Sequence, residues 1–373
     1  MLFGILFYFI KFYFLFPFYH PYLFFLHLIL NLIFALFIYR KLAPFYEKSK
    51  KEIHEKYPEF SRVDKINFYR LYLGLVFLVW PRAISFVILM AIMAIVVNLG
   101  KNIHDPKQKP YKDTVYSIGS LLVLYSLGFI NIKIIRNDEK AKEIYKKYLG
   151  PDYEIDYNKK FVTVLCNHTS WVESYFFNYY YCAGYIGKKS ASKIPGIKQI
   201  GVYNQTIYVD RTDKDSREKT AKAIEERQKN IYNGTNLTHL AIYPEGTTTN
   251  GKYLIKFKRG AFMSLLPLKP WVQLVDQNEE SNLSVGPVDM HWHMVYTCCF
   301  LWHNDRFLEL PVVEPTEFMY ENYKDLGSEK WMIYMEVTKK IMAETAGLLQ
   351  SEKSHPEKFE YMSLITGKKI KNT

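Results

Sequence analysis

Cysteine is scarce in this chain of 373 residues, and its spacing fits neither a disulfide framework nor a metal site. The four cysteines are Cys166, Cys182, Cys298 and Cys299, and the adjacent pair makes a poor joint set of zinc ligands. We therefore expect reduced structural thiols, a reducing compartment and no bound metal ion.

Nucleic-acid-binding motifs and repeat periods are also missing, although the formal net charge is +12. We therefore expect no nucleic-acid partner. Basic stretches such as 188–193 and 256–259 leave two alternatives open. In one interpretation they line the entrance of a phosphate-binding site, and in the other they form a surface that is attracted to anionic lipid headgroups.

Charged residues are absent from a long stretch near the N-terminus. Tyr22–Tyr39 has no Asp, Glu, Lys or Arg, and its length is near the lower limit for a membrane-spanning helix. Residues 1–18 are similarly apolar but contain Lys11 and Pro17, and they lack the basic start and small-residue cleavage site of a signal peptide. The pattern predicts N-terminal membrane helices.

A second apolar stretch, Leu71–Leu99, is interrupted by Pro81 and Arg82. Either two helical arms enter and leave the membrane on one face, or a single kinked helix spans it. Residues 40–70 are rich in Lys and Glu, which places this loop on the cytoplasm-like side. Val115–Ile130 is a third apolar helix, which touches the bilayer or, as we favour, underlies the globular part.

Three stretches are predicted as strands, and polar residues follow each of them directly or after one proline. The stretches are 161–166, 204–209 and 239–243, and the residues after them are Asn167 and His168, Asp210 and Arg211, and Glu245, Gly246 and Thr247. Open α/β sheets bind ligands beyond the carboxyl ends of their strands. We therefore expect these residues to form one site.

His168 and Glu173 are the candidate catalytic pair. A helix that begins near Thr169 brings the Glu173 carboxylate, five residues on, back to the imidazole. The carboxylate then fixes the tautomer and leaves the other ring nitrogen to accept a hydroxyl proton. The alternative is an ordinary helix start with a solvated glutamate.

Four motifs in order resemble those of the glycerolipid acyltransferase (PlsC-type) family: Asn167–Glu173, Ile207–Arg211, Tyr243–Thr247 and Leu266–Pro270. Further stretches are similar to its lysophosphatidylcholine and lysophosphatidylethanolamine acyltransferases, among them Gly246–Gly251, Phe257–Phe262 and Phe307–Pro311. The resemblance implies transfer of an acyl chain from acyl-CoA to the free hydroxyl of a lysophospholipid, at a phospholipid membrane and without a cofactor.

The resemblance also implies the role of each site residue. His168 is the general base and Glu173 holds it, Arg211 binds the phosphate of the acceptor, Glu245, Gly246 and Thr247 position its glycerol end, and Lys258 adds positive charge. Backbone N–H groups near Leu266–Leu268 are the expected oxyanion donors.

One residue departs from the family pattern, because Glu173 stands where the family has Asp. The extra methylene moves the carboxylate by about 1.5 Å, and a shift of ~1 Å in a catalytic group can lower the rate on the order of 10²-fold. The alternative function is therefore a catalytically weak or inactive scaffold or lipid-binding subunit of a larger membrane complex.

The expected fold class is α/β, a glycerolipid-acyltransferase-like α/β domain with N-terminal membrane helices. We divide the chain into a membrane anchor with a basic loop (1–64), a membrane hairpin with an apolar helix (65–135), the acyltransferase domain (136–350) and a polar C-terminal tail (351–373). We expect an integral or monotopic membrane protein of the endoplasmic reticulum, or alternatively of the inner mitochondrial membrane, with its globular domain on the cytoplasm-like face.

Overall fold

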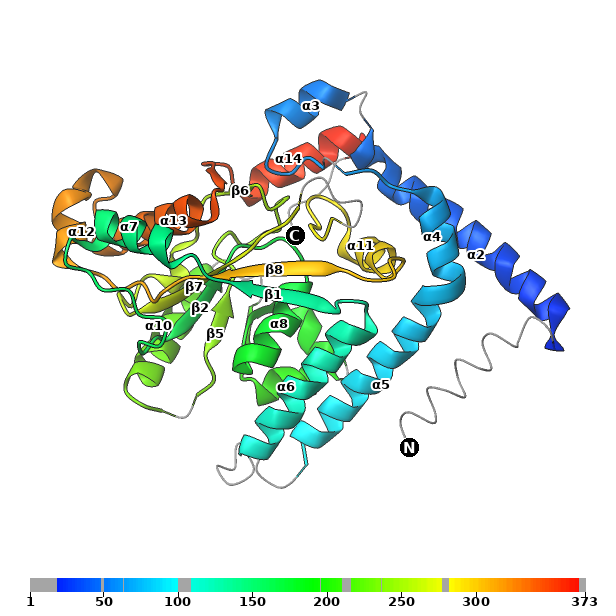
Figure 1. The fold of residues 1–373 in the computed structure, drawn as a ribbon, viewed down its shortest axis with the longest axis horizontal. Helices are drawn as coiled ribbons and strands as arrows, with labels where there is room; N and C mark the ends of the chain where they lie inside the picture. Colours follow the sequence, from blue (N-terminus) through cyan, green and yellow to red (C-terminus); the bar gives the residue numbers. More distant parts are fainter. Residues whose placement is uncertain are drawn as a thin grey trace.

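The structure, a computed structural model, describes residues 19–47, 50–62, 64–99, 109–194, 196–209, 216–235, 237–276 and 282–368. A globular α/β part contains a central sheet between two layers of helices, and a group of long helices lies on one side of it (Figure 1). The predicted fold class is confirmed.

The central sheet has five strands in the order β1-β8-β7-β2-β5. Their bounds are β1 Asn131–Ile135, β8 Asn304–Glu309, β7 Leu268–Gln273, β2 Thr163–Cys166 and β5 Leu240–Ile242. Strand β2 is parallel to both β5 and β7, β7 is antiparallel to β8, and β8 is parallel to β1. The carboxyl ends of β2, β5 and β7 therefore lie at one edge of the sheet.

Helices cover both faces of this sheet, and successive residues of β2 face opposite layers. Val164 and Cys166 pack with Phe176 of helix α8 (Val172–Tyr181), whereas Leu165 packs with the opposite layer. That layer contains α7 (Asp138–Leu149), α10 (Ser216–Tyr232) and α13 (Lys330–Ala346). Burial on both faces explains why 161–166 is almost continuously apolar in the sequence.

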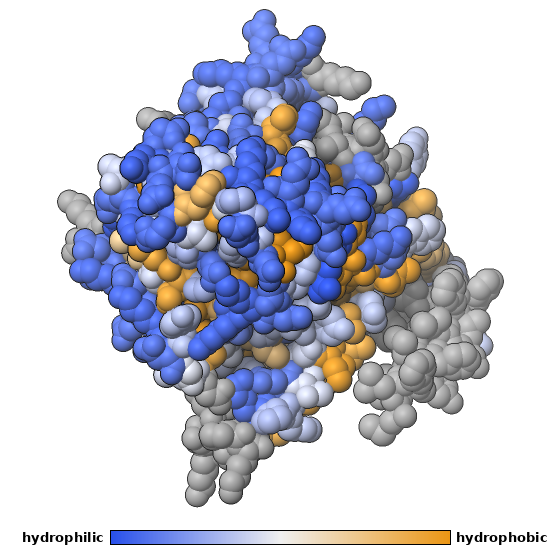
Figure 2. Space-filling view, turned by 60° about the vertical axis from the view of Figure 1, so that its left-hand side comes forward, coloured by the Kyte–Doolittle hydropathy of each residue, from blue (hydrophilic) through white to orange (hydrophobic). Residues whose placement is uncertain are grey.

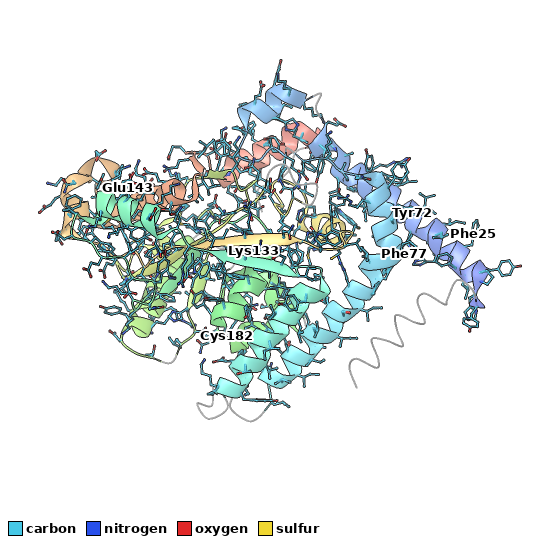
Figure 3. The ribbon with its side chains drawn as sticks, in the orientation of Figure 1. Phe25, Tyr72, Phe77, Lys133, Glu143 and Cys182 are labelled. Carbon is cyan, nitrogen blue, oxygen red and sulfur yellow. The ribbon has the colours of Figure 1, made fainter. Side chains whose placement is uncertain are left out.

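Two helical stretches are long and apolar enough to cross a membrane: Pro21–Tyr46 and Phe68–Val97. The first contains α2 (Pro21–Leu42), and the second contains α4 (Phe68–Gly74), a π-helical segment (Leu75–Val79) and α5 (Trp80–Val97). Large apolar side chains on both helices are exposed, among them Phe25 and Phe77 (Figure 3). The face of the molecule seen in Figure 2 is, by contrast, mainly hydrophilic. The two helices indicate membrane association.

The prediction of two helical arms joined at Pro81 is wrong, because Phe68–Val97 is one continuous helix. A π-helical segment, Leu75–Val79, ends directly before Trp80 and Pro81, and its changed hydrogen-bond spacing accommodates a residue that lacks an N–H within the continuous helix. The chain instead reverses after α5 into α6 (Lys109–Ser126), which packs closely against α5. A Cβ on Gly119 would lie 2.5 Å from the Met93 side chain.

The shorter elements complete the chain. They are α3 (Lys51–Lys56), β3 (Ile186–Lys188), α9 (Ile197–Tyr203), β4 (Ile207–Val209), β6 (Tyr253–Leu254), α11 (Met290–Thr297), α12 (Glu317–Asn322), β9 (Leu349–Gln350) and α14 (His355–Thr366). Strand β4 pairs with β3 in a separate two-stranded sheet. Residues 351–373, expected only as a polar tail, contain helix α14.

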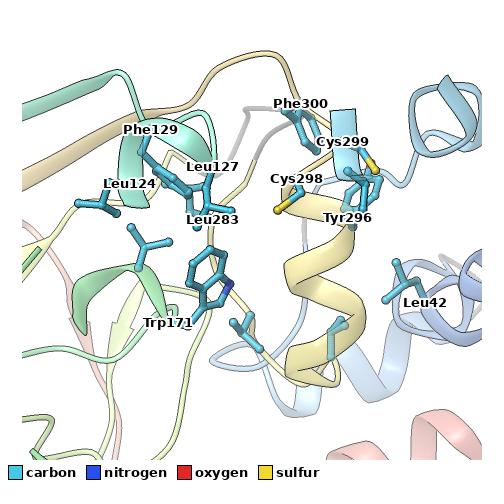
Figure 4. Packing of buried hydrophobic residues seen from close by; sticks show 14 of the residues in the cluster. Leu42, Leu124, Leu127, Phe129, Trp171, Leu283, Tyr296, Cys298, Cys299 and Phe300 are labelled. Carbon is cyan, nitrogen blue, oxygen red and sulfur yellow. The ribbon is translucent and has the colours of Figure 1, made fainter. Parts of the chain in front are cut away.

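One buried apolar cluster joins the long helices to the globular part (Figure 4). It contains Leu42 of α2 and Leu124 of α6 together with Trp171, the residue before α8, and Tyr296 of α11. Helix α6 also buries Tyr116, Val123 and Leu124, and it therefore underlies the globular part, as we favoured. The start of α8 thus shares a buried cluster with Pro21–Tyr46 and Phe68–Val97, which we call the membrane-type helices.

Candidate active site

His168 and Glu173 lie in direct contact at the carboxyl edge of the sheet. The His168 Nδ1 atom is 2.8 Å from Glu173 Oε2. The Glu173 side chain is fully buried, whereas 20% of the His168 side chain is exposed. A buried carboxylate that holds one nitrogen of a partly exposed imidazole is the arrangement that a general base requires.

The start of α8 explains how a glutamate fits at this position. Glu173 lies in the first turn of the helix, and its Oε1 accepts hydrogen bonds from the backbone N–H groups of Thr169 (2.5 Å) and Ser170 (2.7 Å). These bonds turn the side chain back toward the preceding loop and direct Oε2 at His168. The displacement expected from the extra methylene does not separate the two groups.

One face of the His168 imidazole is covered by an aromatic ring. Tyr243, at the end of β5, stacks on His168 with a centroid distance of 4.3 Å and an interplanar angle of 13°. The Tyr243 hydroxyl lies 3.3 Å from Ser174 Oγ on α8. The ring plane of His168 is therefore fixed by stacking and by the Glu173 bond together. In the described part of the chain, its Nε2 atom has no hydrogen-bond partner and is left for a substrate proton.

Glu245 holds the backbone of His168. Its Oε1 accepts from His168 N at 2.7 Å and its Oε2 accepts from Ile255 N at 3.2 Å. The side chain is buried, and this burial raises the pKa of Glu245 to about 8. Glu245 thus positions protein backbone, and its predicted contact with the glycerol end of a substrate stays a prediction.

Gly246, Thr247 and Lys258 complete the turn after β5. Gly246 has φ +66°, and a Cβ at this position would lie 2.2 Å from Lys258 Nζ. The Lys258 N–H donates to Pro244 O at 2.8 Å, which holds the lysine against the turn. Thr247 is nearly buried. The structure therefore brings these three residues close to His168 and Glu245, as the sequence predicted, while their contacts with a substrate remain predictions.

Arg211 and Asp210 lie outside the described residues. Strand β4, which leads toward them, belongs to the small sheet rather than to the central one. The role of Arg211 in binding phosphate stays a prediction.

The expected oxyanion donors near Leu266–Leu268 are not at this edge, and that prediction is wrong. The parallel register of β2 and β7 places Leu268 beside Thr163, at the amino ends of the strands. The Leu268 N–H is also occupied, because it donates to Val313 O at 2.9 Å.

A buried polar network behind the pair was missed by sequence reasoning. The Thr169 hydroxyl lies within hydrogen-bond distance of both Glu173 Oε1 and Gln273 Oε1. Gln273 Nε2 in turn donates to both oxygens of Asp305, at 2.9 and 3.0 Å. Burial raises the pKa of Asp305 to about 7. These residues come from β7 and β8, and only the strand register brings them together.

Asn167 extends the contact between β2 and β7 beyond the last ladder pair. Its Oδ1 accepts from Gln273 N at 2.7 Å and its Nδ2 donates to Gln273 O at 3.1 Å. This side chain therefore replaces a backbone partner and fixes the strand end that carries His168. Within the described ranges, no group of three His, Cys, Asp or Glu side chains is arranged to hold a metal ion.

Comparison with known proteins gives consistent matches. Lysophospholipid acyltransferase LPEAT1 of Arabidopsis thaliana is 25% identical over 205 residues, which cover 55% of this chain and 49% of that protein. Lysophosphatidylcholine acyltransferase 1 of Homo sapiens is 33% identical over 150 residues, 39% of this chain and 26% of that protein. The chain thus spans about half or less of the length of these relatives.

A solved structure and a family model also match. The 1-acyl-sn-glycerophosphate (LPA) acyltransferase PlsC of Thermotoga maritima aligns with a TM-score of 0.43 and 14% identity, covering 71% of this chain and 97% of that one. The family model described as Acyltransferase matches residues 135–275, which include His168, Glu173 and Glu245. The family resemblance predicted from the motifs is confirmed over this stretch: residues 135–275 match the Acyltransferase family model.

Proposed function

We propose that this protein transfers an acyl chain from acyl-CoA to the free hydroxyl of a lysophospholipid, with His168 as the general base. The observation that carries the proposal is the 2.8 Å contact between Nδ1 of the partly exposed His168 side chain and the buried Glu173 carboxylate. The names of the similar proteins agree with a lysophospholipid acceptor.

The reaction follows from this geometry. His168 Nε2 accepts the hydroxyl proton while the acceptor oxygen attacks the thioester carbonyl. The imidazolium that forms is stabilised by Glu173, which accepts the Nδ1–H throughout. When the tetrahedral intermediate collapses, the carbon–sulfur bond breaks and His168 returns the proton to the CoA sulfur. The thioester is already activated, so that no cofactor is required.

A lipid acceptor fits the surroundings of the site. Trp171 and Val172, which directly follow the loop that carries His168 (residues 167–170), belong to the same buried cluster as Met93 and Val97 of α5 (Figure 4 shows the Trp171 side). Helix α8 also contacts α5: the ring of Tyr175 packs edge-on against Phe86 with a centroid distance of 6.1 Å, and its hydroxyl lies 3.8 Å from Met90 Sδ. The helix that carries Glu173 is therefore packed against a helix that indicates membrane association. An acceptor held in the bilayer can approach along this apolar side while CoA stays in water.

The alternative of an inactive scaffold rested on Glu173, and no described contact now favours it. The test is release of CoA from acyl-CoA with a panel of lysophospholipids, for the natural protein and for His168→Ala in detergent micelles. We expect turnover that His168→Ala abolishes. Absence of turnover with every acceptor, or full turnover by His168→Ala, would contradict the proposal.

A further inference from the structure

The C-terminal helix α14 packs against α3, and it begins some eighty residues after the stretch that matches the family model (Figure 1, red). A capping box of Ser354 and Glu357 begins the helix. Tyr361 is fully buried and packs against Tyr57 and Phe60, from the segment between the two membrane-type helices. Helix α14 is therefore an integrated part of the fold.

Lys358 extends from α14 into the turn that follows Glu245. It is 8% exposed, and its Nζ atom donates to Thr248 O at 2.8 Å and to Thr248 Oγ1 at 2.6 Å. The Thr248 hydroxyl donates onward to Gly286 O at 3.0 Å. One buried ammonium group thus fixes the position directly after Gly246 and Thr247.

The same turn is held from its other side by the segment that precedes α4. Asn250 Nδ2 donates to Pro58 O at 2.6 Å and to Ser61 O at 2.9 Å, and Asn250 N donates to Glu59 O at 2.9 Å. Thr249 N donates to His168 O at 2.9 Å. Movement of this turn would therefore be transmitted to the backbone of the catalytic histidine.

A lysine is an unfavourable choice for packing at this position. Its ammonium has no carboxylate within ion-pair distance among the described residues, and burial lowers the pKa of Lys358 to about 7. Burying this amine costs free energy, whereas burying an apolar side chain of similar length would not. What Lys358 does provide, at the end of a long side chain, is a donor that reaches both oxygens of Thr248.

We propose that Lys358 is a positioning residue of the active site: it holds the turn at Thr248, so that the neighbouring Thr249 can hold the backbone of His168. The catalytic consequence rests on the proposed function, whereas the structural one does not.

The test compares Lys358→Met, Lys358→Arg and, as a matched control, Lys368→Met, an exposed lysine just beyond the same helix. The first readout is hydrogen exchange of the amides of His168 and of residues 247–251. We expect faster exchange in Lys358→Met and unchanged exchange in Lys368→Met. This readout does not depend on turnover, so it remains decisive if the natural protein proves inactive.

The second readout is kcat measured separately from KM. Because Lys358 acts through the backbone of His168, Lys358→Met should lower kcat about tenfold and leave KM for both substrates nearly unchanged. Lys358→Arg, which keeps a hydrogen-bond donor at this position, should recover part of the lost kcat.

A purely structural lysine predicts a different set of results. If Lys358→Met lowers thermal stability but keeps the kcat of the natural protein, or if Lys358→Arg is no more active than Lys358→Met, the inference is overturned. Unchanged exchange at His168 and at 247–251 overturns it as well. Faster exchange in a protein without measurable turnover would support the positioning role and refute the proposed function alone.

Discussion

Replacing Glu173 by Gln tests the catalytic pair most sharply, because the amide keeps the shape but exchanges one acceptor oxygen for an NH₂ donor. In the structure every partner of the carboxylate can donate: His168 Nδ1–H to Oε2, and the backbone N–H groups of Thr169 and Ser170 and the Thr169 hydroxyl to Oε1. An amide has only one oxygen, so either His168 or the backbone N–H groups of Thr169 and Ser170 must face its NH₂ group.

The less unfavourable orientation keeps the oxygen on the two backbone donors and turns the NH₂ toward His168. The imidazole must then accept at Nδ1 and carry its proton on Nε2, where it cannot act as a base. An imidazole held in the wrong tautomer in this way loses on the order of 10⁴ in kcat in the serine protease triad. We expect a decrease of ~10³ to 10⁴-fold for Glu173→Gln.

The assay is CoA release under saturating substrates, with thermal unfolding as a check of the fold. Glu143→Gln on α7 is the control, since this glutamate is exposed and remote from the catalytic edge (Figure 3). Glu173→Asp should retain the correct tautomer but reach less far, and we expect a loss of about 10 to 10²-fold. A Glu173→Gln variant that is folded and keeps the kcat of the natural protein would refute the reasoning.

Three further predictions follow from the site. Gly246→Ala should unfold at a clearly lower temperature than Gly234→Ala. Both positions have positive φ, where a side chain costs about 1–2 kcal/mol, but only the Cβ at 246 would contact Lys258. Equal melting temperatures of the two variants would contradict this close contact. Tyr243→Phe should keep kcat and Tyr243→Leu should lower it about tenfold, because only the former retains the ring stacked on the catalytic imidazole; equal kcat values would exclude the stacking role. Asp305 holds a proton in the folded state up to about pH 7 but loses it near pH 4 when the chain is unfolded. Raising the pH from 4 to 7 should therefore lower the melting temperature of the natural protein, and should lower that of Asp305→Asn less. Melting temperatures that fall equally in the two proteins across this window would contradict the raised pKa.

The catalytic pair could be predicted from the sequence because its geometry is local. His168 and Glu173 are five residues apart at the start of one helix, and Glu245 follows a strand whose burial is evident from its composition. Parallel pairing of β2 and β5 then brings both strand ends together. Local pattern and sheet direction were sufficient for these residues.

The remaining features depend on information that local patterns do not contain. Gln273 and Asp305 meet through strand register, and Leu268 was assigned to the wrong edge for the same reason. Lys358 reaches the site from a helix packed far along the chain. Pro81 predicts a break, and only the π-helical segment before it allows the helix to continue.

The contacts of Asn250 with residues 58–61 have a practical consequence for dissecting this protein. Removing residues 1–64 would take away the segment that covers the turn at 248–250 together with the anchor, and it would leave three hydrogen bonds of Asn250 without their partners. A fragment shortened in this way is therefore expected to lose activity because this turn is uncovered, although it keeps every strand of the central sheet. In this architecture, attachment to the bilayer and assembly of the catalytic centre use the same stretch of chain.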